Sequence, residues 1–221
     1  MQQSVGIFGK LPAHGDFIDR GLPSSFISIW DEWLQRCISS SQSRLGNQWL
    51  DYYLVAPIWR FVLTNGVIDN NQYIGIVMPS VDSVGRYFPL TIAHKIQASE
   101  NPFIALSEPS WFQHAENTAI NALNHRENID DMFRQLQGVK PNAQNNTQAN
   151  FQNQRGQYAF LSINAYTFTD LYSELLFKSR LNDMPAFSLW HQNNQNESHK
   201  YFESAGLPSP DVYTMMISGS W

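Results

Sequence analysis

YIGIVMPSVDSVGR, residues 73–86, joins a strongly apolar segment to a loop of turn-forming residues. Tyr73–Met78 has the β-branched and aromatic composition of a buried strand. Pro79–Arg86 contains proline, serine, aspartate and glycine, which favour turns for different physical reasons. Strand character returns over Tyr87–Ile96. The stretch therefore predicts two strands joined by a loop.

The N-terminus repeats this arrangement. Ser4–Phe8 predicts a short buried strand, and Gly9–Asp16 predicts a loop dense in turn residues. If the strands before the two loops run in the same direction, both loops meet at one edge of the sheet, which is the usual ligand side of open α/β sheets. Five charged residues would then gather there: Lys10, Asp16, Arg20, Asp82 and Arg86. They could form an ion-pair network that pins the loops, or a functional site.

Helical patterns lie between and after these strands. Ser24 is a plausible N-cap for a helix whose apolar residues recur at helical spacing through Cys37. Further helices are expected over Pro109 to about Asn124, with Ser110 and Gln113 resembling a capping box, and over about Thr169–Arg180. A short helix is expected after Ser209, with Pro210 in its first position.

The remaining strands complete the expected sheet. Tyr52–Leu63 is β-rich although Pro57 interrupts it, and Asn65-Gly66 resembles a hairpin turn. Tyr158–Ile163 and Ala186–Trp190 are also expected to be strands. The alternation of strands and helices predicts an α/β fold, specifically a three-layer α/β/α sandwich with a mixed sheet.

An Asn/Gln-rich tract interrupts the second half of the chain. Nine of the thirteen residues from 142 to 154 are Asn or Gln. Such a segment buries too little apolar surface to offset its ordering entropy, so we expect a mobile loop at about 140–156. Residues 1–221 are otherwise expected to form one domain.

Composition argues against several classes of function. The net charge is −5 with only 14 Lys and Arg, so binding to nucleic acid or to an anionic membrane surface is disfavoured. No apolar run is long enough to span a membrane, and the N-terminus lacks the pattern of a signal peptide. The single cysteine, Cys37, agrees with a reducing compartment. These features predict a cytoplasmic protein.

Motifs for catalysis are incomplete. Gly6-Ile7-Phe8-Gly9-Lys10-Leu11 lacks both the spacing and the Ser or Thr of a phosphate-binding loop, so a tight turn that needs glycine is the better interpretation. His14, Asp16 and Asp19 have no second ligand pair at metal-site spacing. There is no Gly-x-Ser-x-Gly element, and Cys37 falls on an apolar helix face. We therefore expect no catalytic residue, metal or cofactor.

An ordered series of motifs resembles one protein family. The series comprises Gly6–Pro12, Gly15-Asp16-Phe17, Arg20, Leu22-Pro23, Trp30-Asp31-x-Trp33-Leu34, Tyr53–Phe61, Pro79–Thr91, Ser188-Leu189-Trp190 and Gly206-Leu207-Pro208. It looks like the signature of TagF (also called ImpM), an accessory family of the bacterial type VI secretion system. The resemblance implies a compact α/β/α sandwich without enzymatic activity that represses secretion post-translationally. It also implies a protein partner, the forkhead-associated-domain scaffold Fha.

Two other classes of function stay open at this point. One is a small-ligand-binding or enzymatic protein that uses loops 9–16 and 79–86, and the other is a structural component of the secretion baseplate. A ligand site would require a concave pocket between the two loops, whereas a regulator could have them closed by ion pairs.

Overall fold

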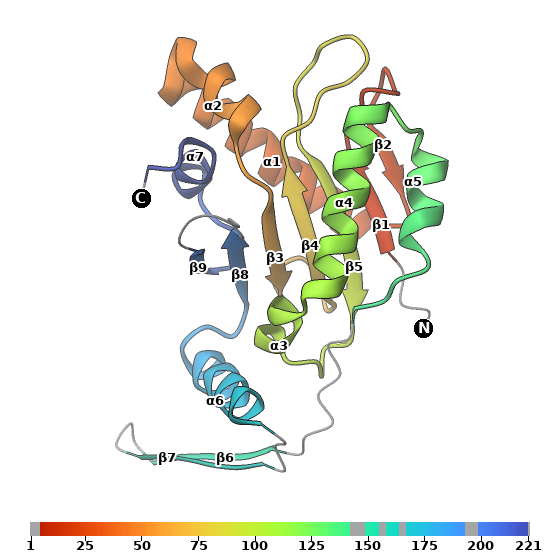
Figure 1. Ribbon diagram of the computed structural model, residues 1–221. Coiled ribbons are helices and arrows are strands. Elements are labelled where there is room, and N and C mark those ends of the chain that lie inside the picture. The colour runs from red at the N-terminus through yellow and green to blue at the C-terminus, as the bar shows by residue number, and fades with distance from the viewer. Residues whose placement is uncertain (1–4, 142–148, 155–157, 164–166, 193–198, 221) are drawn as a thin grey trace.

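A seven-stranded sheet organises the computed structural model, which describes residues 5–141, 149–154, 158–163, 167–192 and 199–220 (Figure 1). The strand order is β2-β1-β5-β4-β3-β8-β9. Its strands are β1 (Val5–Gly9), β2 (Ile18–Arg20), β3 (Trp59–Leu63), β4 (Gln72–Met78), β5 (Leu90–Ile96), β8 (Phe187–Gln192) and β9 (Lys200–Ala205). Strands and helices thus share one body, which confirms the α/β character.

The expected mixed sheet is wrong. Every neighbouring pair in this sheet is antiparallel. Strands β3, β4 and β5 follow one another in the chain, lie side by side in the sheet and are joined without a helix. A connection without a crossover helix makes the chain reverse its direction, so the strands that it joins are antiparallel. Since β5 pairs antiparallel with both β1 and β4, those two strands nevertheless run in the same direction.

Helices pack against both faces of the sheet. The described helices are α1 (Ser24–Leu45), α2 (Trp49–Val55), α3 (Pro102–Ser107), α4 (Pro109–His125), α5 (Ile129–Leu136), α6 (Phe168–Asp183) and α7 (Pro210–Ser218), with a 3₁₀ turn at Gly46–Gln48. Helix α6 lies beyond the end of the sheet and packs against α3 (Figure 1). Strand side chains alternate between the faces. Ile74 and Ile76 join the core beneath α3, α4 and α5, whereas Tyr73 and Val77 join the core beneath α1, α2 and α7.

Helix ends follow local capping chemistry. The prediction for α7 is confirmed, because Ser209 caps it and Pro210 occupies its first position. Two predicted caps are wrong. Ser24 is already inside α1, which Pro23 precedes, and the cap of α4 is Glu108, whose carboxylate accepts a hydrogen bond from the Ser110 amide.

The Asn/Gln-rich region contains regular structure. Residues 149–154, part of the expected loop at 140–156, form strand β6 (Ala149–Gln154). It pairs antiparallel with β7 (Tyr158–Ile163), the strand predicted at those residues. The backbone groups of the Asn- and Gln-rich strand β6 are satisfied by the backbone of β7, with Gln152 opposite Phe160 and Asn153 opposite Ala159. Residues 142–148 and 155–157 of the expected loop lie outside the described residues.

Candidate functional site

The two loops singled out in the sequence meet at one end of the sheet. One follows the C-terminal end of β1 and the other follows the C-terminal end of β4, and both strands point to the same end (Figure 1). The Lys10 ammonium lies 2.7 Å from the Asp82 carboxylate, and both side chains are buried. The expectation that these loops come together therefore holds, although the sheet that brings them together is antiparallel.

Asp82 accepts four hydrogen bonds. Oδ1 accepts from the backbone amides of Val84 (3.0 Å) and Arg86 (2.8 Å). Oδ2 accepts from Lys10 Nζ and Arg86 Nε, both at 2.7 Å. A carboxylate offers about four acceptor positions, so Asp82 is saturated by its own chain. This arrangement favours a pin between the loops over a ligand-binding carboxylate.

The electrostatics of Asp82 agree with this role. Burial by itself raises the pKa of the Asp82 carboxyl, but hydrogen bonds from Lys10, Arg86 and Val84 outweigh it and hold the pKa well below its ordinary range. The same pair, with Asp16 nearby, raises the pKa of Arg86. Both groups are therefore ionised at neutral pH, and neither is suited to exchange a proton there.

Further contacts join the loops. Ser80 Oγ donates to the Lys10 carbonyl at 2.7 Å, and the Ser83 amide donates to the His14 carbonyl at 2.9 Å. Arg86 also donates to the Gly15 carbonyl. Helix α2 is fastened to the same place, because the Tyr53 hydroxyl contacts both the amide and the carbonyl of Ser80 at 3.0 Å. The loops and the end of α2 thus form one connected unit.

Gly9 shows why the first loop needs glycine. Its φ is +130°, and a Cβ there would lie 2.0 Å from the Pro89 carbonyl oxygen. The backbones of Gly9 and Pro89 lie so close together that a residue with a side chain at position 9 would clash. The interpretation of Gly6–Leu11 as a turn that requires glycine, and not as a phosphate-binding loop, agrees with this geometry.

Apolar side chains are exposed around the pinned loops. Phe17 lies over the Lys10 ammonium, 5.0 Å from Nζ to the ring centre, and packs edge-on against Phe88. Val84 is 68% exposed and Val55, at the end of α2, is 78% exposed. We call the loop-end surface the set Phe17, Leu54, Val55, Val84 and Arg86. It combines aromatic, aliphatic and guanidinium groups, the composition of protein-binding surfaces.

The other two candidate charges occupy different positions. The Asp16 side chain is fully exposed and lies 3.6 Å from the Arg86 guanidinium, at the outside of the loop pair. Arg20 does not join the group, so its expected place is wrong. It lies on β2, where it pairs with Asp130 of α5 at 2.8 Å and covers the Phe133 ring. Arg20 is the last residue of the short edge strand β2, which places it beside α5 and away from the loops.

Other residues considered for chemistry take structural roles. Cys37 is buried in α1, and burial raises the pKa of its thiol to about 12. His14 Nε2 accepts a hydrogen bond from the Ile129 amide at the start of α5. Within the described part of the chain, no group of three or more His, Cys, Asp or Glu could hold a metal. No helix among the described residues is long and apolar enough to cross a bilayer.

Sequence reasoning missed a second buried ion pair. Arg60 of β3 makes a bidentate contact with Glu116 of α4, at 2.5 Å from Nε and 2.9 Å from Nη2, and lies over the Phe112 ring. Burial lowers the pKa of the neighbouring His191, and the Arg60 charge lowers it further. The sequence does contain one sign of this buried pair, which is an arginine within the otherwise apolar run Trp59–Leu63.

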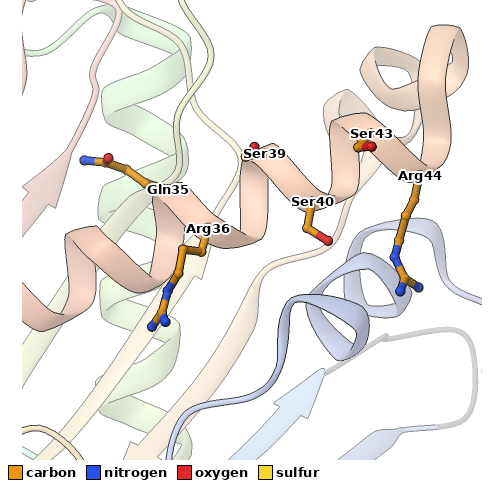
Figure 2. A pocket seen from close by; sticks show the side chains of 6 residues that line it. All are labelled: Gln35, Arg36, Ser39, Ser40, Ser43 and Arg44. Carbon is orange, nitrogen blue, oxygen red and sulfur yellow. The ribbon is translucent and has the colours of Figure 1, made fainter.

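A shallow hollow runs along the outer side of α1 (Figure 2). Its six lining residues all come from that helix: Gln35, Arg36, Ser39, Ser40, Ser43 and Arg44. Arg44 pairs with Asp211 of α7 at 2.6 Å, and Arg36 lies 3.9 Å from Glu32. Because no second element contributes a converging group, the hollow lacks the construction of an active site.

The part of the chain that contains both loops matches a known protein family. The model of the TagF N-terminal domain, described as type VI secretion system-associated, matches residues 6–139. The chain belongs to the TagF family. The matched region contains both loops, α2 and the Lys10–Asp82 pair, so the loop end of the sheet lies wholly inside the family domain.

A solved structure resembles this TagF-family chain over almost its whole length. PA0076 from Pseudomonas aeruginosa PAO1 is 29% identical, with a TM-score of 0.82, and the match covers 99% of this chain and 96% of that one. No curated protein sequence matches the chain. The TagF resemblance inferred from the motifs is therefore confirmed, and with it an association with type VI secretion.

Proposed function

We propose that this TagF-family protein is a cytoplasmic, non-enzymatic negative regulator of type VI secretion that acts after translation. It binds and sequesters a secretion component, and we propose the forkhead-associated-domain scaffold Fha as that component. The match to the type VI secretion-associated TagF domain carries this proposal. The body would be a three-layer α/β/α sandwich that serves as a rigid support for a binding surface.

The chemistry of the loop end supports binding over catalysis. The buried Asp82 carboxylate is saturated by Lys10, Arg86 and Val84, so it has no acceptor position left for a substrate. A pinned loop pair presents its exposed groups in a fixed arrangement, and pre-organisation lowers the entropic cost of association. Sequestration requires no more than such a surface.

The loop-end surface is the proposed contact with the partner. Exposed Val84 and Val55 supply apolar area, and Phe17 and Arg86 supply the aromatic and guanidinium anchors that dominate many interfaces. A carboxylate at an exposed apolar position would have to be desolvated on binding, which is costly. Val84→Glu and Val55→Glu should therefore weaken binding while leaving the fold intact.

A pull-down of purified Fha scaffold with the variants tests this contact. We expect Val84→Glu and Val55→Glu each to reduce captured scaffold by at least about tenfold, the effect of 1.4 kcal/mol. Ile120→Glu is the matched control, since Ile120 is also exposed but lies on α4. Undiminished capture by both variants would contradict this surface, and no capture by the unmodified chain would contradict Fha as the partner.

A further inference from the structure

Helix α6 carries an apolar stripe on its outer side. Phe168, Tyr172 and Leu176 follow one another at intervals of four residues and are 76%, 59% and 48% exposed. Side chains at this spacing lie on one face of a helix, and the Phe168 and Tyr172 rings stack with centres 6.3 Å apart. From Phe168 to Ser179, every exposed residue of α6 is uncharged.

The opposite face of α6 is held by the body of the protein. Ser173, Glu174 and Phe177 are buried, and Glu174 accepts a hydrogen bond from the Asn101 side chain, the N-cap of α3, at 2.9 Å. The apolar stripe therefore cannot turn inward without breaking these contacts. It lies at the end of the molecule away from the loop-end surface (Figure 1).

We propose that this stripe is an interface with a second copy of the same chain, in which two α6 helices pack antiparallel through their exposed faces. The two-fold axis crosses the exposed face of α6 at the level of Glu174, whose side chain lies on the buried face. In that arrangement, residues equally far before and after Glu174 meet across the axis. Tyr172 meets Leu176 of the other copy, and Thr169 meets Ser179. No like charges are opposed along this seam.

The ends of the seam are also complementary. Phe168 of one copy meets Arg180 of the other, and a guanidinium against an aromatic ring is a favourable pairing. Arg180 already contacts Glu203 of β9 at 2.5 Å, which fixes the guanidinium and balances its charge. The sequence of α6 thus complements itself in the antiparallel direction, which is why the second copy is the occupant that we propose.

The size of the seam sets the strength of association. Sixteen residues of helix extend for about 24 Å, and one helix face buries less than the roughly 800 Å² per partner of stable complexes. We therefore expect a weak dimer whose population depends on concentration. This association is independent of the proposed binding of a secretion component at the loop-end surface.

Sedimentation velocity of the full chain, from low micromolar to near-millimolar concentration, tests the proposal. The unmodified chain should pass from monomer to dimer. Tyr172→Glu and Leu176→Lys, both at exposed positions, should each weaken association by at least about tenfold. Ile120→Glu on α4 should dimerise like the unmodified chain, and circular dichroism should show all variants folded.

The decisive sample is an equimolar mixture of Tyr172→Glu and Leu176→Lys. In the mixed antiparallel dimer, the glutamate at position 172 of one variant meets the lysine at position 176 of the other. At the second contact, Leu176 of the first variant meets Tyr172 of the second, as in the unmodified dimer. The mixture should therefore associate although neither variant does so alone. A monomeric unmodified chain, single variants that dimerise normally, or a mixture that stays monomeric would each overturn the proposal.

Discussion

Asp82 links the two loops through a charge that depends on pH. Its folded-state pKa lies below the ordinary value of 3.8, so the unfolded chain binds the proton more tightly. The contribution of Asp82 to stability is therefore fully present above about pH 4 and is lost as pH falls toward the folded-state pKa.

Asp82→Asn should remove this dependence. The variant should be less stable at pH 7, because the buried Lys10 ammonium loses its anionic partner. It should also lose less stability than the unmodified chain between about pH 4 and about pH 2.5, a range that starts near the ordinary aspartate pKa and extends below it. Urea unfolding at successive pH values measures both effects. Asp16→Asn, at a fully exposed carboxylate, is the control, and equal pH profiles for all three proteins would refute the account.

Arg60 and Glu116 form the other buried pair. Glu116→Gln leaves a buried guanidinium without a counter-charge, and breaking such a pair costs about 3–5 kcal/mol. Urea unfolding should show that loss, whereas Glu32→Gln on the exposed face of α1 should cost under about 1 kcal/mol. The double variant Arg60→Met, Glu116→Leu should recover most of the loss. Failure of the double variant to recover would indicate a role for the charges beyond their mutual compensation.

The Arg60–Glu116 pair also shows that the sequence can reveal a buried charge without revealing its partner. An arginine in an apolar run signals a buried charge, but its partner lies 56 positions along the chain, on a different element. Lys10 and Asp82 could be placed together only because each follows a strand that ends on the same side. Long-range side-chain pairing becomes predictable when topology restricts it, and β3 and α4 offered no such restriction.

Among the elements, those with a single clear pattern were predictable. Tyr73–Met78 lies within β4, and the expected helix from Pro109 matches α4. Helix α2 was missed, since its aromatic residues resembled the strand that follows. Its helical period is visible only in the burial of Trp49 and Tyr53, one turn apart. Aromatic side chains are enriched in strands because they pack well on a half-buried sheet surface, but in α2 they pack from a helix instead.

The β6–β7 hairpin provides an element-level prediction. It forms its own two-stranded sheet, separate from the main one. Replacing residues 142–166 with a short Gly-Ser linker should lower Tm by no more than about 3 °C, because loop length has a small entropic effect and 1 kcal/mol corresponds to about 2–4 °C at this chain length. Differential scanning calorimetry measures the change, and a substantially larger drop would show that the hairpin packs against the body.

At the scale of the whole molecule, the sequence predicted the meeting of the loops but not the sheet that produces it. A mixed sheet was expected because strands alternate with helical segments. The N-terminal strand β1 instead enters beside β5, antiparallel to it, and this places β1 and β4 in the same direction on either side of β5. The turn signal at Asn65-Gly66 indicates a hairpin, and β3 and β4 do pair antiparallel. No local pattern specifies that β1 lies beside β5, so the full strand order was not predictable.

We propose that the loop-end surface, held in place by the Lys10–Asp82 pair, represses secretion by occupying its target. Occupancy follows the concentration of the binder relative to its dissociation constant and its target. Repression should therefore be graded, and raising the level of the Fha scaffold should relieve it. Deletion of the chain should raise secretion without changing transcript levels.

The most direct measurement is secretion output against the measured cellular ratio of this protein to the Fha scaffold. Sequestration predicts that repression increases with the ratio and becomes complete only when the two proteins are present in comparable amounts. The Val84→Glu variant should require a higher ratio for the same effect, and Ile120→Glu should follow the unmodified chain. Complete repression at a ratio far below one would contradict sequestration, because one binder cannot occupy many targets at once.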